Sequence, residues 1–136
     1  MTRAQIIRLS VGLSLLIGLA IALLTLTPAE RLPEAPGGDK LHHFLAFAVL
    51  VLPVASVRPR WGLWAVPLAI AYGGAIELIQ PHVGRHGEWA DFWANSAGAL
   101  AGWAIGAVLH VWPLRPLWRR WQQVAPAYVR SRSRKR

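Results

Sequence analysis

The sequence contains no cysteine among its 136 residues. Disulfides, thiolate metal sites and cysteine nucleophiles are therefore all excluded. Acidic residues are also scarce, because six Asp and Glu stand against fifteen Lys and Arg, which gives a formal net charge of +9. A basic surplus of this size can indicate nucleic-acid binding. Here it accompanies long apolar stretches, which favours a cytoplasmic membrane face and predicts no nucleic-acid partner.

Apolar stretches long enough to cross a bilayer occur four times along the chain. A helix advances about 1.5 Å per residue, so about 20 apolar residues cover the hydrocarbon core. We therefore predict an all-α membrane protein, a four-helix transmembrane bundle with a short C-terminal interfacial helix. The predicted transmembrane domain is residues 1–112, with spans at about 6–27, 40–57, 61–80 and 92–112. A secretory signal peptide is the alternative for the first span, but its apolar region would be shorter.

Residues 113–136 differ in character from the spans. Pro113–Val124 places tryptophan and leucine near one helical face with arginines beside them, which predicts an interfacial helix. Arg130–Arg136 forms a basic tail. We expect the tail to lie in the cytoplasm and to contact anionic lipid.

The fourth span carries a stripe of small residues at a spacing of four, namely Ala94, Gly98, Gly102 and Gly106. Such a stripe allows another helix to approach closely. It predicts tight packing and indicates no specific function.

The basic residues predict the orientation of the bundle. Twelve of the fifteen lie in the N-terminus, the Arg58–Arg60 turn and the C-terminal segment, and three lie in the two opposite loops, namely Arg31, Lys40 and Arg85. The positive-inside rule then places both termini in the cytoplasm. The acidic residues, which were not used in that count, all fall at or near the outer end: Glu30, Glu34, Asp39, Glu77, Glu88 and Asp91.

Polar residues from three stretches are expected to meet at this outer end, because antiparallel helices with short loops place these ends side by side. The predicted ligand-binding residues are Asp39, Lys40, His43, Glu77, Gln80, Arg85, Asp91 and Asn95. Asp39 and Asp91 are also the predicted N-caps of the second and fourth helices, and capping explains either one about as well as a binding role does. An acid inside an apolar span is costly, so Glu77 needs a function or a partner such as Arg85 or Lys40.

The order and spacing of these motifs resemble the VanZ-like family of small membrane proteins. The resemblance rests on D-K-x-x-H-F-x-x-F at Asp39–Phe47 and E-x-x-Q at Glu77–Gln80, followed by Arg85, Asp91, Asn95 and Gly98. It implies a multi-pass protein of the bacterial inner membrane. The name-giving member of the family is linked to teicoplanin resistance, which suggests a link to glycopeptide antibiotic resistance.

Three hypotheses for the function remain open. The favoured one is the binding or handling of a phosphate- or sugar-bearing envelope lipid at the outward-facing polar site, with membrane lipids as partners. The second is a membrane-embedded enzyme acting on a lipid phosphate, with His43, Glu77 and Asp91 as candidate catalytic residues. A metal site of His, Glu and Asp is a variant of it, although we predict neither metal nor cofactor for the favoured reading. The third is a structural or regulatory protein whose polar cluster only locks the helices.

Overall fold

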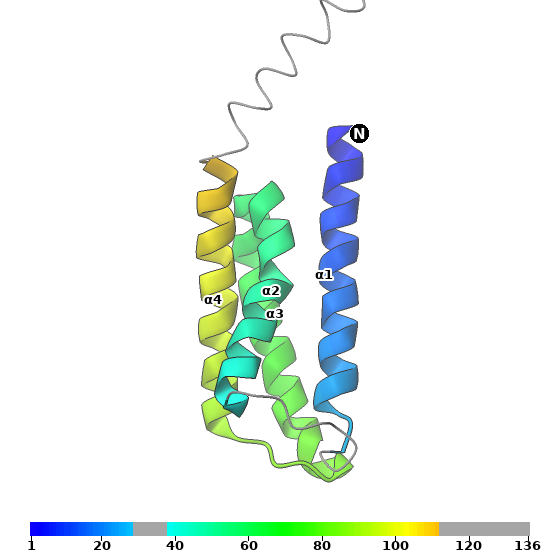
Figure 1. Ribbon diagram of the computed structural model, residues 1–136, viewed down its shortest axis with the longest axis vertical. Coiled ribbons are helices and arrows are strands. Elements are labelled where there is room, and N and C mark those ends of the chain that lie inside the picture. The colour runs from blue at the N-terminus through cyan, green and yellow to red at the C-terminus, as the bar shows by residue number, and fades with distance from the viewer. Residues whose placement is uncertain (29–37, 112–136) are drawn as a thin grey trace, which may run out of the picture.

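The structure is a computed structural model that describes residues 1–28 and 38–111. These residues form four long α-helices and one short 3-10 helix, and no strand occurs among them. The elements are α1 (Arg3–Thr25), α2 (Asp39–Val57), α3 (Pro59–Ile79), the 3-10 helix η2 (Gln80–Val83) and α4 (Trp89–Val111). The helices run up and down beside one another (Figure 1). The predicted all-α bundle is confirmed, whereas the predicted interfacial helix lies outside the described residues.

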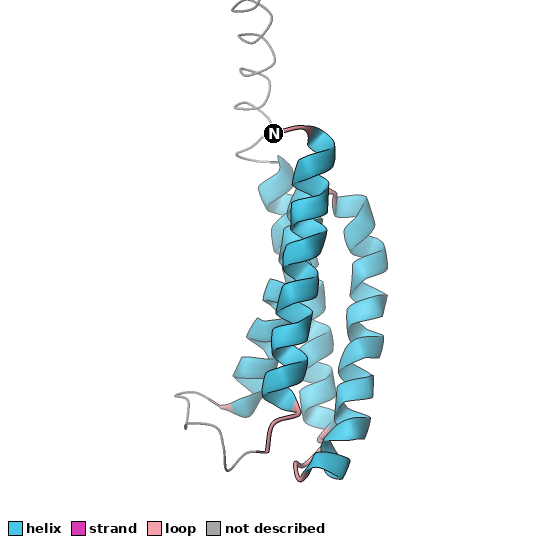
Figure 2. Cartoon of the chain, turned by 90° about the vertical axis from the view of Figure 1, so that its right-hand side faces the viewer, coloured by secondary structure: helices cyan, strands magenta, loops and turns pink. Residues whose placement is uncertain are grey.

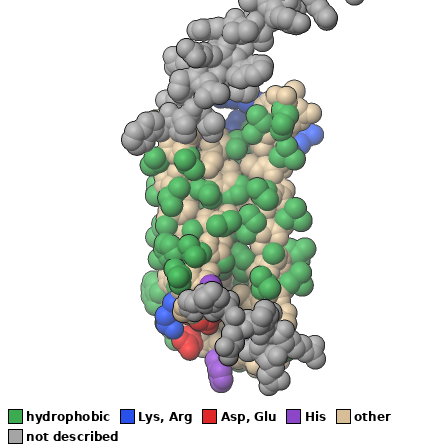
Figure 3. All heavy atoms as spheres, viewed as in Figure 1, with side chains coloured by type: hydrophobic (Ala, Val, Ile, Leu, Met, Phe, Trp, Pro, Cys, Tyr) green, Lys and Arg blue, Asp and Glu red, His purple; other side chains and the backbone are tan. Residues whose placement is uncertain are grey.

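Each of the four helices is long and apolar enough to cross a membrane. Their outward faces carry large apolar side chains. Leu15 and Leu68, for example, are 70% and 72% exposed. Such surfaces would be costly in water and suit lipid tails. Apolar side chains cover the visible face between the two ends, and charged side chains gather at the ends (Figure 3).

Two of the helix starts differ from the sequence-based expectation. Gly38, with extended backbone, is the N-cap of α2, and Asp39 is the first helical residue. α4 begins at Trp89, so Asp91 lies inside its first turn and is buried. Neither aspartate is therefore the N-cap that we predicted, although a carboxylate in the first turn still interacts favourably with the helix dipole. Capping does not account for the burial of Asp91.

The small-residue stripe of α4 packs directly against α2. A Cβ added at Gly98 would lie against the backbone carbonyl of Phe44, and one at Gly102 against that of Ala48. Contact between α2 and α4 is the most extensive in the bundle. The predicted tight packing is confirmed, and its partner is α2.

α2 contacts each of the other three long helices, and α1 lies at one edge of the bundle (Figure 1). Phe47 and Val51 of α2 form the core with Ile76 of α3 and Ala99 of α4. α1 contributes Ile21 to this core. The Tyr72 hydroxyl of α3 also donates a hydrogen bond of 2.6 Å to the carbonyl of Gly18 in α1. The long, close contact between α2 and α4 fixes the relative positions of the polar residues at their ends.

Candidate functional site

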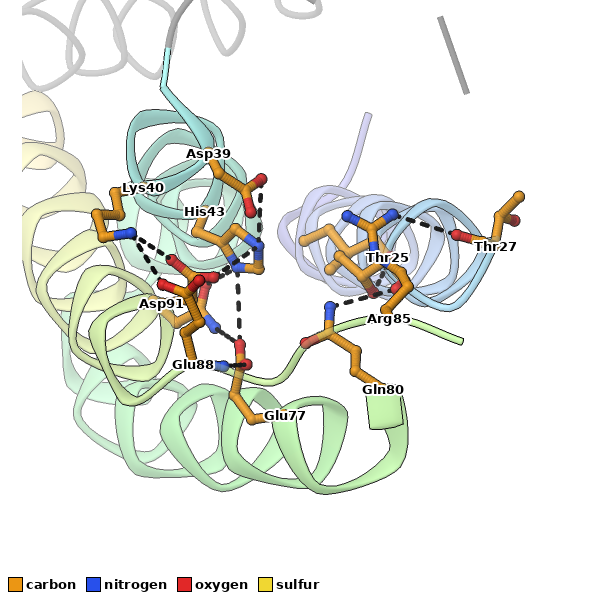
Figure 4. A network of polar contacts seen from close by, with 12 residues as sticks. Thr25, Thr27, Asp39, Lys40, His43, Glu77, Gln80, Arg85, Glu88 and Asp91 are labelled. Carbon is orange, nitrogen blue, oxygen red and sulfur yellow. Dashed lines mark hydrogen bonds and ion pairs between the residues drawn. The ribbon is translucent and has the colours of Figure 1, made fainter. Parts of the chain in front are cut away.

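The end of α1, the start of α2, the end of α3 with η2 and the start of α4 all lie at the same end of the bundle (Figures 1 and 2). Polar side chains meet there in two groups (Figure 4). The first, here called the His43 cluster, joins α2, α3, α4 and the loop before α4 and consists of Asp39, Lys40, His43, Glu77, Glu88, Asp91 and Asn95. The second, here called the α1 latch, consists of Gln80 and Arg85 bound to the backbone of Thr25 and Thr27.

A chain of buried hydrogen bonds runs from Glu77 through Asn95 to His43. The Asn95 amide Nδ2 donates to Glu77 Oε1 at 3.3 Å. Asn95 Oδ1 lies 3.0 Å from His43 Nδ1. Asn95 is fully buried and His43 is 5% exposed. Because an ionised Glu77 can only accept, the amide nitrogen of Asn95 faces it and the amide oxygen faces the imidazole, so that His43 donates through Nδ1.

The other imidazole nitrogen lies between two carboxylates. His43 Nε2 is 3.8 Å from Asp39 Oδ1 and 4.0 Å from Asp91 Oδ2. The Asp91 side chain is 3% exposed, whereas that of Asp39 is 59% exposed. The imidazole thus faces a deeply buried carboxylate on one side and one at the surface on the other.

Lys40 and Glu88 form the exposed rim of the His43 cluster. Lys40 Nζ lies 3.1 Å from Glu88 Oε2 and 3.8 Å from Asp91 Oδ1. Asp91 Oδ1 is buried and accepts no hydrogen bond in the described part of the chain. The backbone N–H of Glu88 donates to Glu77 Oε2 at 3.1 Å, which ties the loop before α4 to the end of α3.

Gln80 and Arg85 lie apart from this cluster. The Gln80 amide donates to the Thr25 carbonyl at 3.3 Å, and the Arg85 guanidinium donates to the Thr27 carbonyl at 3.2 Å. The Thr25 carbonyl is one that the C-terminal end of α1 leaves without a helical partner, and Thr27 follows the C-cap Leu26. Glu77, expected to pair with Arg85 or Lys40 if it were structural, instead accepts from Asn95 and the backbone of Glu88.

Six of the eight predicted site residues thus belong to one cluster, and two bind α1. Sequence reasoning placed Glu88 at the outer end but left it out of the site. Its position three residues before Asp91 was an available signal, because residues three apart near a helix start share one face.

The His43 cluster contains four carboxyl groups against a single lysine and a single histidine. Ionisable groups at the end of membrane spans are costly unless they are paired or reach water. Such a site favours hydroxyl groups, which donate to carboxylates, and cations. It repels a bare phosphate unless a cation accompanies it.

The fold and this cluster define a multi-pass membrane protein with a buried polar site at one end of its bundle. A family comparison matches residues 6–110 to VanZ/LLP1. The chain therefore belongs to the VanZ/LLP1 family. Searches of the curated proteins and of the solved structures found no match.

Proposed function

We propose that this protein binds the polar head group of a sugar- or phosphate-bearing envelope lipid at the His43 cluster. The observation that carries the proposal is the burial of Asp91, Asn95 and His43 at a helix end whose rim, Asp39, Lys40 and Glu88, is exposed. Buried ionisable groups in membrane spans commonly mark substrate or ion sites. The exposed rim gives a head group access to the buried groups from the membrane surface.

The charges of the cluster favour contacts with hydroxyl groups. Carboxylate oxygens of Asp39, Asp91 and Glu88 can accept hydrogen bonds from sugar hydroxyls, and Lys40 can donate. Lys40 is also the nearest permanent cation for a phosphate, although it already pairs with Glu88 and Asp91. A lipid acyl chain would meanwhile lie along the apolar outer surface of the bundle.

We further propose that the site faces outward from the bacterial inner membrane, with the N-terminus in the cytoplasm. Arg58 and Arg60 lie at the end opposite the His43 cluster, together with the start of α1, which carries Arg3 and Arg8 (Figure 1). The guanidinium of Arg58 lies 5.3 Å from the ring centre of Trp61. Arginine beside tryptophan is typical of a cytoplasmic membrane interface.

Binding can be tested with three lipids that share their acyl chains: diacylglycerol, monoglucosyl diacylglycerol and phosphatidic acid. The purified full chain in detergent micelles would be examined by native mass spectrometry for retained lipid. We expect retention of the glucosyl lipid, the phosphate lipid or both above diacylglycerol. Asp91→Asn and Glu77→Gln should lose this preference, whereas His82→Ala should keep it because His82 is exposed and, within the described residues, contacts the Leu78 carbonyl of its own turn rather than the His43 cluster. Equal retention of all three lipids by the wild type would contradict the proposal.

A structural role for the cluster is the competing function, and Lys40–Glu88 and Asn95–Glu77 do link different elements. In that case Asp91→Asn and Glu77→Gln would lose stability and any phenotype together. If these variants instead lose the head-group preference but unfold at the same concentration of denaturing detergent as the wild type, a binding role is favoured. A link to glycopeptide resistance would appear as a change in teicoplanin susceptibility when the chain is expressed in a susceptible host.

A further inference from the structure

The His43 cluster presents three ligand atoms of the kind that bind divalent cations. His43 Nε2, one oxygen of Asp39 and one of Asp91 all lie within 4.8 Å of one another. In a tetrahedral site, metal–ligand bonds of about 2.0–2.2 Å hold the donor atoms about 3.3–3.6 Å apart. The observed separations of 3.8 Å and 4.0 Å at His43 Nε2 exceed this range by a few tenths of an ångström, and the two aspartate oxygens lie within 4.8 Å of each other.

The hydrogen-bond chain behind His43 determines which nitrogen is available. Glu77 fixes the orientation of the Asn95 amide, and the Asn95 oxygen accepts a hydrogen bond from the N–H of His43 Nδ1. The lone pair of a neutral His43 is then at Nε2, directed at two carboxylates that have no proton to donate when ionised. A lone pair facing two anions is unfavourable unless a cation lies between them. This arrangement matches metal-binding histidines, whose second nitrogen usually donates to a fixed acceptor.

A second observation concerns the other oxygen of the same carboxylate, Asp91 Oδ1, since Oδ2 is the one that lies 4.0 Å from His43 Nε2. Asp91 is 98% buried, and its Oδ1 accepts no hydrogen bond in the described residues, although Lys40 Nζ lies 3.8 Å away. A buried carboxylate oxygen without a hydrogen-bond donor is costly. A divalent cation bound to Asp91 would satisfy the carboxylate more fully than this distant lysine does.

We propose that His43 Nε2, Asp39 and Asp91 bind a single divalent cation, of which Mn²⁺ and Zn²⁺ best match one imidazole and two carboxylates. This differs from the sequence-based expectation of no metal. Asp39 is at the exposed rim, so water or an oxygen of a head group can complete the coordination. If the proposed lipid binding holds, the cation supplies the positive charge that a phosphate needs beside four carboxylates. Cation binding itself does not depend on that function.

The experiment measures Mn²⁺ or Zn²⁺ alone, without added lipid. The full chain, carrying no polyhistidine tag, is stripped with a chelator in detergent and titrated with each metal by isothermal calorimetry. We expect saturable binding of one ion per chain, lost in Asp39→Asn and Asp91→Asn. Asp39 is largely exposed, so Asp39→Asn is expected to keep the fold. His82→Ala is the matched control, since it removes an exposed imidazole at the same end of the bundle but not from the proposed ligand set.

Three further tests separate metal binding from a protonated imidazole held between two aspartates. Asn95→Ala should weaken the metal affinity by about 10–100-fold, as loss of an outer-shell partner does. Lys40→Met should strengthen it, because the substitution removes a competing positive charge beside Asp91. Electron paramagnetic resonance of bound Mn²⁺ should show coupling to a histidine nitrogen that disappears in His43→Gln. No saturable binding by the wild type, or equal binding by wild type and Asp39→Asn, would overturn the proposal.

The outcomes for metal and for lipid are distinguishable. Metal binding without a head-group preference would support the cation site and contradict the lipid proposal. A head-group preference that persists in chelator-treated protein, with no metal uptake, would support lipid binding and contradict the cation site.

Discussion

Asn95 of α4 holds the imidazole of His43 in α2 by an interhelical contact of 3.0 Å between Oδ1 and Nδ1, and both residues are buried. The same asparagine donates to Glu77 of α3. One amide group therefore connects three helices and orients the histidine at the centre of the candidate site. Its removal would leave polar groups on both α2 and α3 without their partner.

We predict that Asn95 and His43 are energetically coupled. Interhelical hydrogen bonds in membrane proteins contribute about 0.6 kcal/mol on average and up to about 1.7 kcal/mol. A double-mutant cycle of Asn95→Ala and His43→Ala, measured by unfolding in mixed detergent micelles, should give a coupling energy in that range. Asn95→Ala alone should lower the free energy of unfolding further, because Glu77 also loses a donor.

Ser96→Ala is the matched control for this cycle. Ser96 is buried beside Asn95, but its hydroxyl donates within α4 to the Phe92 carbonyl at 2.8 Å. No interhelical bond is lost, so its coupling to His43→Ala should be close to zero. Equal coupling energies for Asn95 and Ser96 with His43 would show that the contact contributes nothing specific.

The sequence was sufficient to predict the fold because each span is long, apolar and bounded by polar residues. It also predicted that His43, Glu77 and Asn95 lie at one end. It could not separate Arg85 from them, since a long arginine side chain in a loop can reach either the cluster or the end of α1. The structure shows it at Thr27. The position of Asp91 was misjudged for a local reason: α4 begins at Trp89, ahead of the expected cap.

The orientation of the imidazole was equally inaccessible from sequence. Spacing places Asp39 and His43 one turn apart, but which nitrogen faces the aspartates depends on the Asn95 amide from another helix. Helix-face arguments identify neighbours along one helix, whereas the rotation of one helix against the next is fixed by packing. Here that packing is set by the glycines of α4.

We predict that Gly98→Ala and Gly102→Ala each destabilise the bundle by about 1–3 kcal/mol, the usual range for overpacking. The added methyl groups would meet the carbonyls of Phe44 and Ala48, which are backbone atoms and cannot rotate away. α2 and α4 would have to separate, and the Asn95–His43 contact should weaken with them. Unfolding in mixed micelles measures the stability.

Gly12→Ala in α1 is the control for these substitutions, because a Cβ there has nothing within 4 Å. It brings the same gain in helix propensity, up to about 1 kcal/mol, without the clash. We expect stability equal to or above that of the wild type. If Gly98→Ala and Gly12→Ala behaved alike, the close approach of α2 and α4 would not limit stability.

The last prediction concerns the direction in which the site faces. Because the chain has no cysteine, single introduced cysteines report on accessibility without background. Ala4 lies in the first turn of α1 and His86 in the loop between η2 and α4, which are at opposite ends of the bundle, and both residues are exposed. A membrane-impermeant maleimide added to intact bacterial cells should label His86→Cys, and it should label Ala4→Cys only after lysis. Twelve of the fifteen basic residues lie in the N-terminus, the Arg58–Arg60 turn and the C-terminal segment, which favours this orientation. The reverse pattern would place the His43 cluster in the cytoplasm, where an envelope lipid head group on the outer surface could not reach it.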